Sequence, residues 1–155
     1  MDDRTKPTRP GGARYDRDLY SWAVEQAALL RAGKIAEVDA LNIAEELDDV
    51  GNEQYDKLES ALRVILLHLM KWDHQPERQS RSWYASIAVQ RNHAEKVLRK
   101  NPGLKPHIAE AIAEGYKDAR VEAAAETGLR ETTFPETCPY AWEEIMGRQF
   151  NWPDE

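Results

Sequence analysis

The chain has 155 residues, of which 41% are hydrophobic, and it carries a formal net charge of −7 at pH 7. This length suits one ordinary domain, which buries about 70% of the surface that its unfolded chain exposes. No apolar run approaches the ~20 residues that a membrane-spanning helix needs, and charges and prolines stand at the N-terminus where a signal peptide would be apolar, so we expect a cytoplasmic protein without a membrane segment.

Residues 1–14 have almost no apolar side chains and contain two prolines and two glycines. Such a segment cannot offset the entropy cost of ordering, so we expect a flexible tail followed by a single helical domain over residues 15–155. A first helix is predicted from about Asp16 to Gly33, where glycine can adopt a left-handed cap. Its expected inward face consists of Leu19, Trp22, Ala23, Gln26, Leu29 and Leu30.

The second predicted helix begins near Asp39, a good N-cap residue, and ends around Trp72. Apolar residues recur along it at helical spacing and form one seam: Leu41, Ala44, Leu47, Gly51, Tyr55, Leu58, Leu62, Ile65, Leu69 and Trp72. The phase of this seam continues through Gly51, which favours one long helix with Gly51 as its point of bending. Two helices joined at residues 50–53 are the alternative.

Pro76 predicts a turn over residues 73–81, after which a third helix starts near Ser82, with Ser82 as its N-cap, and stops at the Asn101-Pro102-Gly103 sequence. A fourth helix is predicted with Pro106 in its first turn and Gly128 at its end. The remaining residues are rich in aromatics and are expected to form a short helix and an arm that wraps the core. The predicted fold class is therefore an all-α antiparallel bundle of four main helices.

Charge is distributed unevenly along the chain. Between His74 and His107 there are seven basic residues and two acidic ones, whereas residues 39–59 hold eight acids and only Lys57 as a base. Internal ion pairing between these segments is one interpretation. Nucleic-acid binding through the basic third helix is an alternative that we do not expect, because an acidic protein repels a polyanion at longer range.

A cluster of polar and aromatic residues surrounds the turn between the second and third helices. Its members are His68, Trp72, Gln75, Arg78, Ser82, Trp83, Gln90 and Arg91. As a structural latch, the cluster would hold the helical hairpin together, with Glu45 or Glu59 as acidic partners of Arg91. As a ligand site, it would use His68 as an acid or base and the arginines as an anion clamp.

No catalytic set can be completed from these residues. Ser82 lacks the glycine-flanked turn of a serine nucleophile, and Cys138 is best explained as a small apolar or capping residue. None of the four histidines follows a glutamate by three positions, and no histidine and cysteine spacing matches a zinc site, so we expect neither a metal nor a cofactor.

Four stretches of the chain resemble a known family: AEEL (44–47), HLMKWDHQPERQSRSWYASIAVQR (68–91), NPGLKP (101–106) and ETGLRETTFPETCPY (126–140). Together they are similar to the bacterial domain-of-unknown-function family number twenty-nine, seen mainly in cyanobacteria and proteobacteria. The resemblance covers about Tyr15 to Trp152. It implies a small helical domain and brings no activity, substrate or cofactor.

The best functional hypothesis is a non-catalytic protein-interaction module, either a homo-oligomer or the partner of another small protein. The first alternative is an enzyme or anion binder that uses the corner formed by His68, Arg78 and Arg91. The second is nucleic-acid binding through the third helix.

Overall fold

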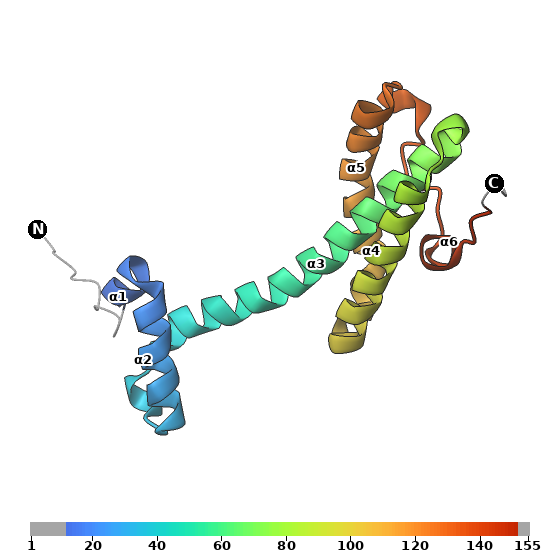
Figure 1. Ribbon diagram of the computed structural model, residues 1–155. Coiled ribbons are helices and arrows are strands. Elements are labelled where there is room, and N and C mark those ends of the chain that lie inside the picture. Colours follow the sequence, from blue (N-terminus) through green and yellow to red (C-terminus); the bar gives the residue numbers. More distant parts are fainter. Residues whose placement is uncertain (1–11, 152–155) are drawn as a thin grey trace, which may run out of the picture. The chain divides into compact units, whose positions relative to one another are not determined.

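The computed structural model describes residues 12–151 and is shown in Figure 1. Its α-helices are α1 (Gly12–Arg17), α2 (Leu19–Arg31), α3 (Ala40–His74), α4 (Arg81–Lys100), α5 (Ile108–Thr127) and α6 (Trp142–Gly147). Short 3₁₀ helices join them: η1 (Ile35–Glu37), η2 (Pro76–Arg78), η3 (Pro102–His107) and η4 (Glu131–Thr133).

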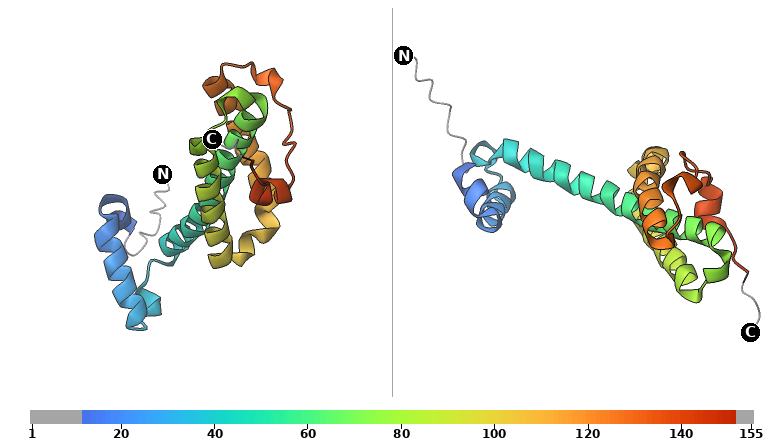
Figure 2. Two further views of the ribbon diagram at one scale, coloured as in Figure 1. Left: turned by 45° about the vertical axis from the view of Figure 1, so that its right-hand side comes forward. Right: turned by 90° about the horizontal axis from the view of Figure 1, so that it is seen from above.

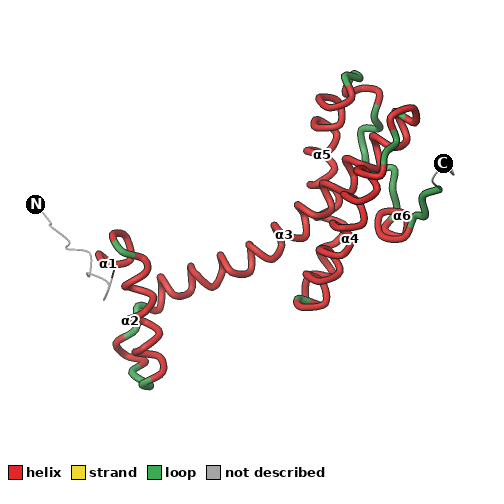
Figure 3. The backbone as a smooth tube through the Cα atoms, viewed as in Figure 1, coloured by secondary structure: helices red, strands yellow, loops and turns green. Residues whose placement is uncertain are grey.

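Helices and loops alone make up the part of the chain that the structure describes, as Figure 3 shows. This confirms the all-α fold class and the four long helices. The second of them, α3, runs without interruption for 35 residues through Gly51, so the interpretation as one helix is confirmed over the alternative of two. Most of the predicted tail, together with Trp152, lies outside the described residues, but residues 12–14 belong to α1.

Local sequence signals explain most helix ends. Asp18 is the N-cap of α2, because its carboxylate accepts a hydrogen bond from the Ser21 backbone amide at 3.0 Å. It separates α1 from α2, whereas a single helix was predicted over these residues. Gly33 and Gly128 adopt left-handed backbone conformations with φ of 72° and 73°, as predicted for the residues that follow helices.

Two predicted helix starts were wrong. Ser80, not Ser82, is the N-cap of α4, because its hydroxyl accepts the Trp83 amide at 3.2 Å while Ser82 lies within the first turn. Pro106 lies in η3 rather than in the first turn of α5, which begins at Ile108. The segment with prolines at both ends winds as a tighter 3₁₀ helix before the α-helix starts.

The described residues form two compact units, which divide within α3 after Asn52. We call residues 12–52 the N-terminal unit and residues 53–151 the C-terminal unit. Each is described separately below.

The C-terminal unit contains the apolar core. Figures 1 and 2 show the last turns of α3 beside α4 and α5, with α6 covering one side. Helix α3 supplies about half of the core residues, including Leu58, Leu62, Ile65 and Leu69 of the seam. The other elements contribute the rest, among them Ile87, Ala94, Tyr116, Phe134 and Ile145. The aromatic-rich segment after α5 contributes to this packing, because Phe134 is only 1% exposed.

Gly115 sets the distance between α5 and α3. A Cβ atom at this position would lie 3.3 Å from the backbone nitrogen of Arg63 and 3.3 Å from the carbonyl oxygen of Glu59. The absent side chain therefore lets the two helix backbones approach closely. Two ion pairs join the same helices, one between Arg63 and Glu122 and one from Lys71 Nζ to Glu126 at 2.6 Å.

Polar contacts organise the N-terminal unit. The buried Asp39 carboxylate accepts the indole N–H of Trp22 at 3.1 Å and the side-chain amide of Asn42 at 2.7 Å. Its backbone N–H donates to Gln26 at 2.8 Å. Trp22 also packs edge-on against Tyr15, with ring centroids 4.8 Å apart. Asp39 was predicted as an N-cap, and it does precede α3, but its carboxylate binds side chains instead of the first-turn amides.

The predicted inward faces of this unit were right at Trp22 and Gln26, which are buried, and wrong at three leucines. Leu19 is 50% exposed, Leu41 is 61% exposed and Leu47 is 65% exposed, although each was assigned to the core. Helical periodicity identifies an apolar face, but it does not say whether the same chain supplies a surface to cover that face.

Substitution of Gly115 by leucine should destabilise the C-terminal unit by about 2 kcal/mol or more, because a side chain there forces α5 away from the α3 backbone. Urea unfolding followed by circular dichroism measures this. Ala113→Leu, at an exposed position on the same helix, is the matched control and should change stability by less than about 0.5 kcal/mol. Equal stability of the two variants would contradict the close packing.

Candidate functional site

The polar residues predicted to converge at the α3–α4 corner have separate roles in the structure. His68 is half-buried and its Nδ1–H donates to the carbonyl of Val64 at 2.8 Å. Burial lowers the pKa of His68 below its ordinary value, so the ring is neutral at pH 7. Gln75 donates to the carbonyl of Thr127 at 2.9 Å, at the last turn of α5. Both side chains thus satisfy backbone groups near the core.

Trp83 takes part in a contact that links three helices. Lys71 of α3 lies over the Trp83 ring, with its ammonium 4.6 Å from the ring centroid. The same ammonium donates to Glu126 of α5. This arrangement joins α3, α4 and α5 and supports the latch interpretation for this part of the cluster.

Arg91 binds the carbonyl end of α6. Its guanidinium donates to the carbonyls of Ile145 at 2.8 Å, Arg148 at 3.0 Å and Glu144 at 3.1 Å. Burial lowers the pKa of Arg91 below its ordinary value. The last carbonyls of a helix have no partner within the helix, and their partial negative charge suits a cation. Arg91 therefore fixes α6 to α4, and within the C-terminal unit its guanidinium contacts these carbonyls and not Glu59, one of its predicted acidic partners.

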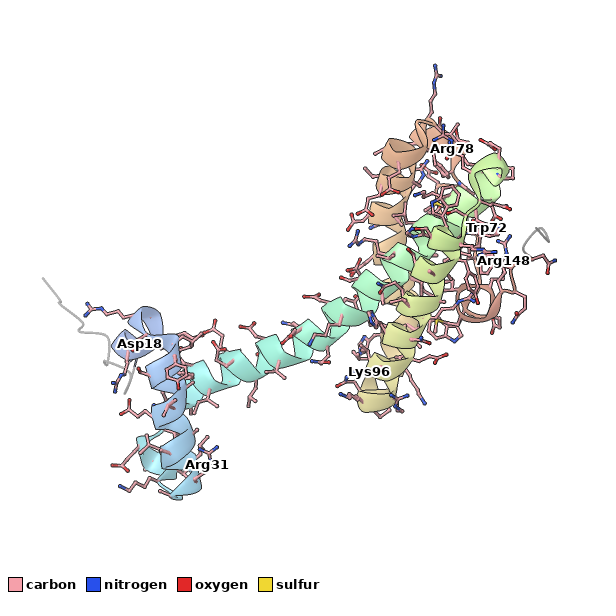
Figure 4. All side chains as sticks on the ribbon, viewed as in Figure 1. Asp18, Arg31, Trp72, Arg78, Lys96 and Arg148 are labelled. Atoms are coloured by element: carbon pink, nitrogen blue, oxygen red, sulfur yellow. The ribbon has the colours of Figure 1, made fainter. Side chains whose placement is uncertain are left out.

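A second network, absent from the sequence-based cluster, holds the C-terminal arm. Arg148 and Asp73 form a two-pronged pair with distances of 2.7 and 3.0 Å, and the Tyr140 hydroxyl donates to the same carboxylate at 2.8 Å. Phe150 packs edge-on against Trp72, with ring centroids 4.8 Å apart. Figure 4 labels Trp72 and Arg148 in this part of the C-terminal unit. The aromatic-rich sequence that contains the FPE-CPY stretch predicted a C-terminal arm. The Asp73–Arg148 pair could not be predicted in the same way, because its two residues are 75 positions apart and form no local sequence pattern.

Burial and hydrogen bonding act in opposite directions on Asp73. Burial raises the pKa of its carboxyl group, but hydrogen bonds from Arg148 and Tyr140 outweigh burial, so the pKa lies below its ordinary value. Burial and the neighbouring carboxylate also raise the pKa of Tyr140 well above its ordinary value. Tyr140 thus remains a hydrogen-bond donor at any physiological pH.

The remaining members of the predicted cluster do not join a common site. Two of them, Arg78 and Ser82, are exposed. A third, Gln90, contacts the ring of His93 at 3.3 Å. Figure 4 shows Arg78 at the opposite end of the C-terminal unit from Lys96. Within the described residues, no group of three or more histidine, cysteine, aspartate or glutamate side chains could hold a metal ion.

A groove in the C-terminal unit lies between α3 and α4. It encloses about 610 Å³, and its apolar floor is formed by Ala61, Val64 and Val97. Basic side chains line it from both helices: Lys57, Arg63, His93, Lys96 and Lys100. Lys57 is paired with Glu53, and Arg63 with Glu122, but no ion pair of Lys96 or Lys100 is found in the part of the chain that the structure describes. Two acids of α3, Glu53 and Asp56, also line the groove. Its α3 side is therefore of mixed charge, whereas Lys96 and Lys100 make its α4 side basic.

The N-terminal unit presents the other distinctive surface. Its helix α2 has only two charged residues in 13, Glu25 and Arg31, yet only Trp22 and Gln26 are buried. A helix that is apolar around most of its circumference normally lies inside a protein. Here Tyr20 is 80% exposed and Val24 is 53% exposed. The apolar surface of this unit is thus a feature that the packing within the unit itself does not explain.

A scan against family models matches residues 14–151 to the domain of unknown function DUF29. The chain belongs to the DUF29 family. This confirms the resemblance noted from the sequence, and it adds no activity for this DUF29 chain. No curated protein and no solved structure matches it. None of the described helices of this DUF29 protein is long and apolar enough to cross a membrane.

Replacement of Arg91 by lysine should release α6, because lysine keeps the charge but cannot reach three carbonyls at once. The expected loss of stability is about 1–3 kcal/mol, the range for hydrogen bonds to a charged group. Urea unfolding measures the loss, and hydrogen exchange in residues 142–148 should become faster. Arg99→Lys, at an exposed position on the same helix, should leave both unchanged.

The lowered pKa of Asp73 predicts a specific acid sensitivity. A carboxyl group whose pKa is lower in the folded state contributes stability above its unfolded pKa, near 3.9, and loses that contribution as pH falls through the folded pKa. Wild type should therefore lose more stability than Asp73→Asn between pH 6 and pH 3, although the variant is less stable at pH 6. Thermal unfolding at each pH measures this, and parallel curves for the two proteins would refute the role of Asp73.

Proposed function

We propose that this DUF29 protein is a non-catalytic protein-interaction module that binds its partner through the N-terminal unit. The observation that carries the proposal is the exposure of eight large apolar side chains in this unit. They are Leu19, Tyr20, Val24, Leu30, Ile35, Leu41, Leu47 and Val50, with exposed fractions of 44–80%. Each of them leaves apolar surface in water, and exposed apolar side chains that gather on one surface mark an interaction site.

The seam of α3 gives this surface a defined geometry. Leu47 continues the stripe that Leu58, Leu62 and Ile65 bury in the C-terminal unit, and the exposed Val50 lies beside it, about 60° around the helix. Positions 47, 58 and 65 fall within about 20° of one another around an ideal helix. An apolar stripe on a helix is stabilised by burial against another surface, and this holds for both halves of α3. A partner surface over Leu47 and Val50 would therefore complete the packing.

The N-terminal unit is too small to bury this surface by itself. Forty residues rarely build a sufficient core without a disulfide, a metal or association with another chain. Its buried side chains are Trp22 and the polar Gln26, Asp39 and Asn42. Those polar contacts fix its conformation but supply little hydrophobic free energy. A binding unit that is ordered in advance and gains its burial from a partner fits these properties.

We infer that the module acts in the cytoplasm. The free, half-buried thiol of Cys138 supports this, since free thiols are retained where the environment is reducing.

Photo-crosslinking in the organism that encodes the chain tests the proposal. A crosslinking amino acid at position 47 should trap a discrete protein, whereas one at position 121 should not. Val121 is the matched control, because it is an apolar residue of the C-terminal unit with 54% exposure. In the same cells, Val50→Lys should abolish the crosslink from position 47 by placing a charge in the apolar stripe. Absence of any discrete product from position 47 would refute the proposal.

Val50→Lys should not act by unfolding the chain. An exposed position tolerates substitution within about 0.5 kcal/mol, so the purified variant should unfold at the same urea concentration as wild type.

A further inference from the structure

The charges of two helical faces are complementary. The first part of α3, residues 40–52, contains four acidic residues and no base. Helix α4 contains five basic residues and one acidic residue, so the two segments carry −4 and +4. Among the four acids, Glu46 accepts the Tyr15 hydroxyl at 2.6 Å. For Glu45, Asp48 and Asp49, no ion pair is found within the described residues.

The acids flank the exposed apolar stripe of α3. Around an ideal helix, Asp48 and Glu46 lie about 100° to either side of Leu47, whereas Glu45 and Asp49 lie about 160° away. A partner that covers the stripe must therefore place its surface beside Asp48 and Glu46. A second N-terminal unit is a poor candidate, because it would bring acids against acids at the rim, and like charges placed together oppose association.

The groove between α3 and α4 has the complementary character. Its floor is apolar at Ala61, Val64 and Val97, and Lys96 and Lys100 stand on its α4 wall. Arg99 adds a further exposed cation to α4, while Arg91 is occupied with the carbonyls of α6. An apolar floor with a basic wall matches an apolar stripe with an acidic border.

We propose that the N-terminal unit of one copy docks in the α3–α4 groove of a second copy, and that the second copy returns the same contact. This deepens the proposed function, on which it rests, by naming the partner as the chain itself. Two reciprocal contacts close a symmetric dimer, whereas a single head-to-tail contact would leave each end open and generate filaments.

A charge swap tests this in the purified full-length chain. One variant carries Glu45→Lys, Asp48→Lys and Asp49→Lys, and the other carries Lys96→Glu, Arg99→Glu and Lys100→Glu. Sedimentation velocity at low ionic strength should show a dimer for wild type and at least tenfold weaker association for each variant alone. An equimolar mixture should recover the dimer, because one interface then pairs wild-type faces and the other pairs two reversed faces.

Two controls isolate the docking contact from general charge effects. Lys117→Glu changes an exposed residue of α5 and should leave the dimer unchanged. Circular dichroism should show the same helix content and urea midpoint for all variants, since every substituted side chain is exposed.

Several results would overturn the inference. The first is that wild type remains monomeric even at a protein concentration 100-fold above that of the sedimentation experiment. The second is that the dimer persists in either charge-reversal variant alone. The third is that the equimolar mixture of the two variants stays monomeric. Salt-sensitive binding of a short RNA by monomeric wild type, lost in the Lys96→Glu set, would assign the basic face to nucleic acid instead. If position 47 still crosslinks to a different protein in cells, the proposed function survives while the self-association fails.

Discussion

The apolar seam of α3 is the constraint on which the rest of the structure depends. In the C-terminal unit it is buried at Leu58, Leu62 and Ile65, and α5 approaches α3 so closely that a Cβ atom at residue 115 would lie 3.3 Å from the α3 backbone. In the N-terminal unit the same seam is exposed at Leu41 and Leu47. One continuous helix thus combines a completed core with an uncovered stripe, and burial of apolar surface is the dominant favourable term in folding and association alike. The uncovered half is therefore where the molecule can gain most from a partner.

Several polar residues around the α3–α4 corner make structural contacts. Arg91 caps α6, Lys71 joins Trp83 to Glu126, and Gln75 binds the end of α5. These contacts rigidify the C-terminal unit and hold α3 and α4 in the positions that form the basic groove. Arg148 and Asp73 do the same for the arm. The free-energy cost of burying these polar residues is thus offset by their hydrogen bonds and ion pairs. The same contacts fix the helices that form the groove.

Sequence patterns predicted the fold well because they depend on local spacing. Helical periodicity, Gly33, Gly128 and the prolines located the four long helices, and the unbroken phase through Gly51 predicted the length of α3. The partners of Arg91 and Asp73 were beyond reach, since they lie more than 50 positions away and involve backbone carbonyls or an arginine without any pattern of their own. The exposure of Leu19, Leu41 and Leu47 was missed for a different reason. Periodicity reports that a face is apolar, and only the tertiary structure reports whether it is covered.

The central claim is that residues 40–52 are covered by a second copy of the chain. Hydrogen exchange of the purified wild-type protein, measured across a range of concentrations, tests it most directly. The account predicts that exchange in residues 40–52 and 93–100 slows together as concentration rises, while exchange in α5 does not change. Rapid exchange of residues 40–52 at every concentration would contradict it.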